Sequence, residues 1–174
     1  GISTDETDMA PELRTSFHYD HVFGTVLNRF LVQAATGEPL TVYGKGGQTR
    51  GFLNIRDTIQ CVALAADTPA DRGDFRIFNQ FTEQFSVKQL AGMVQATAKR
   101  AGVEARIENT PNPRVEQEDH YYNAKHTGLI ELGLQPHLLD DPALDTMFAE
   151  VQANCELVNP DLLPPTIAWA RNEK

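Results

Sequence analysis

The sequence lacks the features that mark several large classes of protein. It has only two cysteines, Cys61 and Cys155, which are too few for a disulfide framework or, by themselves, for a zinc site. Its apolar runs are a few residues long, whereas a membrane-spanning helix needs about 18 or more, and no charged-then-apolar signal pattern is present. Hydrophobic residues make up 41% of the 174 positions, which is enough for a hydrophobic core that needs no disulfide or metal to stabilise it. We therefore expect one soluble globular domain from a reducing compartment, with both thiols buried.

Positive charge is also scarce. The sequence has 15 lysines and arginines against 24 acidic residues, which gives a formal net charge of −9. A charge of this sign repels phosphate at long range and excludes nucleic acid and anionic lipid as general partners. Any anionic ligand therefore needs a local group of cations.

Apolar residues recur alternately at helical and at strand spacing. Helices are predicted over residues 18–35 with Gly37 as the stop, from a capping-box pattern at Asp57 to about 67, from Ser86 to Gly102, from Asn123 to Gly133, and from Asp141 onward. Strands are predicted over residues 40–43, 51–55, 74–78 and 104–109. The proline-rich residues 160–174 are predicted to be irregular. This alternation predicts an α/β architecture in which helices cover sheets.

Three side chains are suited to binding an anionic or sugar-containing ligand. Arg50 follows a glycine-rich turn, and an arginine held on a strand can grip a diphosphate with two hydrogen bonds. Arg114 follows a loop stiffened by two prolines, where less entropy is lost on binding, although capping a nearby helix is an equal alternative. Asn79 follows a predicted strand and offers an amide donor, or else simply forms a turn. Solvation at the surface is the alternative for Arg50.

Other patterns predict no chemistry. Residues 44–47 are glycine-rich, but the dinucleotide and Walker spacings are absent and an extended segment follows, so a connecting turn is favoured. Tyr121 and Lys125 have the Tyr-x-x-x-Lys spacing of short-chain dehydrogenases, but Asn123 is the better helix start, so we interpret the spacing as coincidence. His18 and His21 with Asp20 make a poor metal site without a distant partner. We predict neither a catalytic residue nor a metal site.

Several segments resemble a known family. Residues 40–52, LTVYGKGGQTRGF, resemble the C-terminal half of extended short-chain dehydrogenases that act on nucleotide sugars, in the NAD-dependent epimerase/dehydratase superfamily. More narrowly, the sequence up to about Pro136 resembles the family of UDP-sulfoquinovose synthases, in the segments 4–7, 28–30, 79–86, 111–116 and 120–126. Several motifs in the right order are more specific than any single one.

The resemblance implies a Rossmann-type α/β fold in which residues 1–174 form a C-terminal, substrate-binding half. NAD and the catalytic residues would belong mainly to an N-terminal half that this sequence does not contain, so the isolated chain is expected to be inactive. The whole enzyme would make UDP-sulfoquinovose from UDP-glucose and sulfite for sulfolipid synthesis. It would do so as a homodimer without membrane insertion, in a bacterial cytoplasm or the plastid stroma.

The resemblance also implies a substrate site. In it, two arginines clamp the diphosphate, two amide side chains add hydrogen bonds, and two strand residues hold the uracil; these are Arg50 and Arg114, Gln48 and Asn79, and Thr41 and Tyr43. Two alternatives stay open. One is another UDP-sugar epimerase or dehydratase, and the other is a non-enzymatic module that binds nucleotide sugars.

Overall fold

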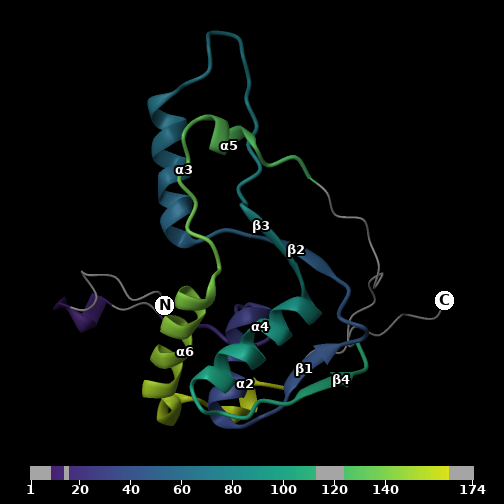
Figure 1. The fold of residues 1–174 in the computed structure, drawn as a ribbon. Coiled ribbons are helices and arrows are strands. Elements are labelled where there is room, and N and C mark those ends of the chain that lie inside the picture. The colour runs from purple at the N-terminus through teal and green to yellow at the C-terminus, as the bar shows by residue number, and fades with distance from the viewer. Residues whose placement is uncertain (1–8, 14–15, 113–123, 165–174) are drawn as a thin grey trace. The chain divides into compact units, whose positions relative to one another are not determined.

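The described part of the chain forms two compact units. In the computed structural model, residues 9–13, 16–112 and 124–164 are described (Figure 1). The first unit takes its described residues from 1–48, 86–119 and 141–174, and the second from 49–85 and 120–140. Each unit combines helices with short strands, so the predicted α/β class is confirmed.

The first unit is built on a parallel pair of strands. Strand β1 (Leu40–Tyr43) pairs with β4 (Ile107–Thr110), so that Tyr43 lies opposite Thr110. Helices α2 (Val26–Thr36), α4 (Val87–Arg100) and α6 (Asp141–Ala153) pack on one another, and α2 and α4 also contact β1 (Figure 1). Short 3-10 helices are found at Pro11–Leu13, Cys155–Leu157 and Pro160–Leu162. The core is filled by Phe30, Leu31, Leu40, Val42, Leu90, Val94, Leu144 and Phe148.

Helix α2 begins later than predicted. The prediction of a helix from residue 18 is wrong, because the Asp20 carboxylate accepts the N–H groups of Val22 and Phe23 and holds a turn there. Thr25 then caps the helix through its side chain, and Gly37, at φ 79°, ends it as predicted. Apolar periodicity cannot detect this local competition.

Helix α4 begins as its sequence predicts. The Ser86 hydroxyl accepts the Gln89 N–H at 3.2 Å, and the Gln89 side chain accepts the Ser86 N–H at 2.8 Å, which completes the capping box. The helix ends at Arg100, and Gly102 follows at φ 77°. Helix α6 likewise begins at Asp141, as predicted.

The second unit contains helices α3 (Ile55–Asp67) and α5 (Gly128–Glu131) and the strand pair β2 (Thr49–Phe52) and β3 (Glu83–Ser86) (Figure 1). Its core is a cluster of Cys61, Leu129 and Leu134 with half-buried leucines and Phe78 around it. Burial raises the pKa of the Cys61 thiol. The prediction of a buried thiol is therefore confirmed for Cys61, whereas Cys155 is only half-buried.

Three boundaries in this unit differ from prediction. Helix α3 is capped by Asn54, one turn before Asp57, because the Asn54 side-chain oxygen accepts the Arg56 N–H at 3.0 Å. The strand predicted over residues 51–55 is displaced to β2. Helix α5 has Thr127 at its N-cap, and the predicted cap, Asn123, lies outside the described residues.

The strand predicted over residues 74–78 is absent. The segment has no regular structure, and Phe75 and Ile77 are 86% and 78% exposed. Strand propensity describes side chains that fit a half-buried sheet, and it cannot supply a pairing partner. The final segment also differs in part, because a 3-10 helix occupies Pro160–Leu162; residues 165–174 lie outside the description. None of the described helices is long and apolar enough to cross a bilayer.

Candidate functional site

Three predicted ligand-binding residues lie in the first unit, on β1 and in the turn that follows it. Thr41 is engaged by two side chains of α2: its hydroxyl and backbone N–H bond the Gln33 amide, and its carbonyl accepts from Arg29. Tyr43 lies at the end of β1, where the guanidinium carbon of Arg29 is 4.6 Å from the ring centroid. Its hydroxyl is buried without a hydrogen-bond partner.

Gln48 is the most deeply buried of the predicted residues. Its exposed fraction is 4%, and its side-chain oxygen is buried and makes no hydrogen bond. Its backbone carbonyl accepts the Val87 N–H at 3.1 Å, which fixes the end of the turn to the start of α4. Buried acceptors without a partner are uncommon in proteins, so the oxygens of Gln48 and Tyr43 are candidate contacts for a ligand that carries hydrogen-bond donors.

The glycine-rich turn is shaped by packing against the protein itself. Gly46 has a φ of 71°, and a Cβ atom there would lie 2.6 Å from Val42 Cγ1 and 3.3 Å from the Lys88 backbone nitrogen. The Gly46 carbonyl also accepts the Lys88 N–H at 3.0 Å. Glycine is therefore required both for the backbone conformation and for close contact with β1 and α4.

Replacing Gly46 by alanine is expected to destabilise the first unit more than the same change at Gly37. Both glycines have positive φ, which costs about 1–2 kcal/mol for an alanine, but a Cβ at Gly37 meets nothing within 4 Å. The difference between the two variants, measured by urea unfolding, isolates the close contact of the added Cβ with Val42 and Lys88. Equal losses would show that this contact relaxes freely.

Two further predicted residues belong to the second unit, and one lies outside the description. Arg50 is exposed on β2, and its Nη1 donates to the Thr49 carbonyl at 2.9 Å. Asn79 is exposed, and its amide donates to the Lys125 carbonyl at 2.6 Å. Arg114 lies outside the described residues, as does Tyr121. The pairing of Arg50 with Arg114 therefore stays a prediction.

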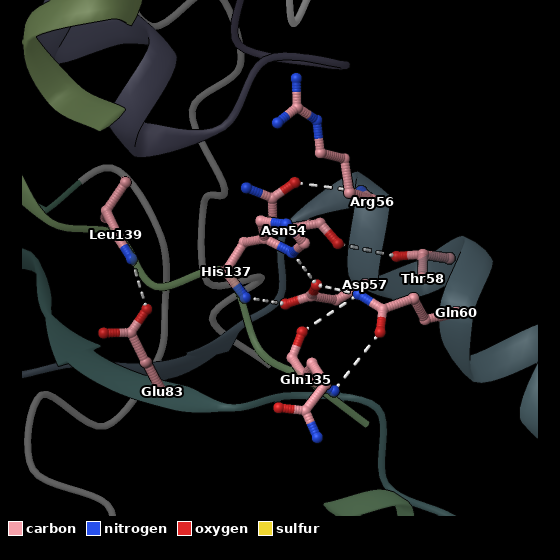
Figure 2. A network of polar contacts seen from close by, with 9 residues as sticks. All are labelled: Asn54, Arg56, Asp57, Thr58, Gln60, Glu83, Gln135, His137 and Leu139. Atoms are coloured by element: carbon pink, nitrogen blue, oxygen red, sulfur yellow. Dashed lines mark hydrogen bonds and ion pairs between the residues drawn. The ribbon is translucent and has the colours of Figure 1, made fainter. Parts of the chain in front are cut away.

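A buried carboxylate organises a polar network in the second unit (Figure 2). Asp57, in the first turn of α3, is 0% exposed. One of its oxygens accepts from His137 Nδ1 at 2.6 Å and from Gln60 Nε2 at 3.0 Å, and the other accepts the His137 backbone N–H at 2.8 Å. A carboxylate can only accept, so the ring proton is on Nδ1.

The same network fixes the loop between α5 and α6. Gln60 donates to the Gln135 carbonyl at 3.1 Å and accepts the Gln135 N–H at 3.3 Å, while Glu83 accepts the Leu139 N–H at 2.7 Å (Figure 2). Loop residues 135–139 thus rely on side chains of α3 and β3 for backbone hydrogen bonds. The network has a structural role, which is to hold this loop in place, because each polar atom named already has a hydrogen-bond partner within the protein.

Sequence reasoning missed the side chains that support these residues. Arg29 and Gln33 stand four residues apart on α2, and Asp57 and His137 are 80 residues apart. Polar residues within an apolar helical repeat are the only signal for the first pair, and no local pattern marks the second. A surface hollow along the last turns of α4 was not predicted either, and no predicted ligand-binding residue lines it.

Comparison with known sequences points to one family. The sequence model of the NAD dependent epimerase/dehydratase family matches residues 12–79. The chain is 55% identical to the chloroplastic UDP-sulfoquinovose synthase of Spinacia oleracea over 98% of this chain and 36% of that protein. It is 46% identical to the UDP-sulfoquinovose synthase of Sulfolobus acidocaldarius over 78% of this chain and 34% of that protein. The chain thus spans about a third of the length of these curated relatives.

Solved structures support the same fold. The UDP-glucuronic acid 4-epimerase of Bacillus cereus, solved with UDP-glucuronic acid and NAD, aligns with a TM-score of 0.60 at 21% identity, over 75% of this chain and 40% of that one. The UDP-glucose 4-epimerase of Thermotoga maritima, solved with UDP-glucose, also aligns with a TM-score of 0.60. The identity is 19%, and the alignment covers 79% of this chain and 42% of that one.

The residues of this chain do not fit the phosphate cradle of NAD. The printed sequence contains no G-x-G-x-x-G motif. Its glycine-rich turn leads into strand β2 instead of a helix, and the space beside Gly46 is filled by Val42 and Lys88. The turn therefore lacks the helix N-terminus that usually faces the pyrophosphate.

Proposed function

We propose that this chain is the UDP-binding part of a UDP-sulfoquinovose synthase, because the model of the NAD dependent epimerase/dehydratase family matches residues 12–79 and the identity to a UDP-sulfoquinovose synthase is high. The whole enzyme converts UDP-glucose and sulfite into UDP-sulfoquinovose. The 55% identity that extends over 98% of the chain is the observation that carries this proposal.

The role of this chain is to hold the nucleotide. Thr41 and Tyr43 hold the uracil on β1, and Gln48, whose buried side-chain oxygen lacks a partner as the Tyr43 hydroxyl does, adds a hydrogen bond to the nucleotide. Arg50 and Arg114 clamp the diphosphate, and Asn79 adds a hydrogen bond. Guanidinium groups suit this task because they remain charged and bind phosphate through two parallel bonds.

NAD and the catalytic groups belong to the remainder of the enzyme. The absence of a fitting phosphate cradle supports this division. The second unit also exposes apolar side chains, among them Ile59 and Val62 on α3 and Phe75 and Ile77 in the following loop. Large exposed apolar side chains are suited to an interface, and we propose that the remainder of the enzyme covers them. The full-length enzyme is a homodimer of the cytoplasm or plastid stroma.

Sulfite-dependent turnover by the full-length enzyme tests the proposal. UDP-glucose is incubated with and without sulfite, and the nucleotide sugars are analysed by mass spectrometry. We expect UDP-sulfoquinovose only when sulfite is present. Formation of an epimerised or dehydrated sugar that ignores sulfite would assign the chain to another UDP-sugar enzyme.

The isolated chain separates binding from catalysis. We expect no turnover of UDP-glucose and no reduction of NAD by the 174 residues alone. Micromolar binding of UDP-glucose by the isolated chain would favour the non-enzymatic binding module, whereas no binding would favour a fragment of the enzyme. Turnover of UDP-glucose by the isolated chain would contradict the proposal that NAD and the catalytic groups belong to the remainder of the enzyme.

A further inference from the structure

We propose that Arg29 and Gln33 form a clamp that positions Tyr43 for the nucleobase. This inference rests on the proposed function, since it concerns how the uridine site is held. Both residues come from α2, are four positions apart, and therefore lie on one face of the helix. Neither residue has a role in the assignment of the site given above.

The Gln33 side chain forms a hydrogen bond with the backbone in the middle of β1, as a neighbouring strand would. Its side-chain oxygen accepts the Thr41 N–H at 3.2 Å, and its side-chain nitrogen donates to the Thr41 hydroxyl at 2.9 Å. Gln33 is 3% exposed. A buried amide with both ends paired has one defined orientation, so it fixes Thr41 relative to α2.

Arg29 holds the same strand and also its terminal side chain. Its Nη2 donates to the Thr41 carbonyl at 3.0 Å. Its guanidinium carbon lies 4.6 Å from the Tyr43 ring centroid and 5.5 Å from that of Phe30, which is fully buried. The planar guanidinium therefore links a strand carbonyl, a core aromatic ring and the Tyr43 ring.

The clamp assigns contact with the base to Tyr43 in preference to Thr41. The N–H, carbonyl and hydroxyl of Thr41 are all engaged by α2. The Tyr43 hydroxyl, in contrast, is buried without a partner. A uracil ring offers one imide N–H and two carbonyls, which suit a phenol that can donate or accept. Positioning this phenol before the ligand arrives reduces the entropy lost on binding.

The variant Arg29→Lys tests the clamp in the full-length enzyme. Lysine keeps the charge but has no planar group to stack on Tyr43 and only a compact ammonium for Thr41. We expect the Kd for UDP to rise about tenfold, while the Kd for inorganic pyrophosphate, which has no base, changes less than about twofold. Arg106→Lys is the matched control, because Arg106 is exposed in the same unit, and both affinities should stay at the wild-type values.

Each outcome has a separate meaning. Equal loss of UDP and pyrophosphate binding would show that Arg29 only supports the fold. Unchanged UDP binding would show that the proposed clamp is wrong, while the proposed function would stand. A wild-type enzyme that binds no UDP would overturn the proposed function itself. If Arg29→Lys does not fold, Gln33→Glu replaces it: a carboxylate still accepts from the Thr41 N–H and hydroxyl, so UDP binding should persist in Gln33→Glu and fall in Gln33→Leu.

Discussion

Replacing Asp57 by alanine is expected to lower the free energy of unfolding of the second unit by about 3 kcal/mol. The carboxylate is fully buried and accepts three hydrogen bonds, two of them from His137. Its removal leaves the His137 backbone N–H and one Gln60 amide proton without a partner, and it opens a cavity beside α3. The His137 ring is 47% exposed and can regain water, which keeps the loss below that of a wholly buried pair.

Amide hydrogen exchange, followed residue by residue, measures the loss of stability in the second unit separately from the first. The amides of α3 and of residues 135–139 should exchange faster in Asp57→Ala, whereas those of α4 should be unchanged. Asp145→Asn is the control, because Asp145 makes an exposed ion pair with Arg100 and surface pairs contribute little. Wild-type protection of α3 in Asp57→Ala would show that the network of Figure 2 is dispensable.

Replacing Arg50 or Arg114 by alanine should each weaken UDP-glucose binding by the full-length enzyme by about 2–4 kcal/mol, or about thirtyfold or more. In the proposed clamp, each change removes one of the two guanidinium contacts with the diphosphate, so part of the ligand charge loses its counterion. Titration calorimetry with UDP-glucose measures both variants.

The matched control for this pair is Arg56→Ala. Arg56 is an exposed arginine on α3 in the same unit as Arg50, and it has no assigned role in binding. Its removal changes the net charge equally but should leave the affinity at the wild-type value. If Arg50→Ala and Arg114→Ala bind UDP-glucose as tightly as the control, the assignment of the diphosphate clamp is wrong.

Elements specified by neighbouring residues could be predicted from the sequence. The capping box of Ser86 and Gln89, the glycine stop at Gly37 and the β1 strand are set by contacts within a few positions, and the structure confirms them. The start of α2 and the missing strand at 74–78 depend instead on a side-chain turn at Asp20 and on a pairing partner. Neither is visible in hydrophobic periodicity.

The candidate site was predictable only where it coincides with a continuous motif. Thr41, Tyr43, Gln48 and Arg50 lie within 13 residues that resemble the family, and the identity to UDP-sulfoquinovose synthases confirms that resemblance. The supporting contacts of Arg29 with Tyr43 and of Asp57 with His137 join separate elements. These contacts form only when the chain folds, so no local spacing in the sequence predicts them.

Nuclear magnetic resonance on the ¹⁵N-labelled full-length enzyme titrated with UDP tests the central claim most directly. One nucleotide held by the predicted residues should shift the amide signals of Thr41–Gln48, Arg50 and Arg114 together, with a single dissociation constant. Shifts confined to other segments, such as the hollow along α4, or an unchanged spectrum at saturating UDP would contradict the assignment of this chain as the nucleotide-binding part of the enzyme.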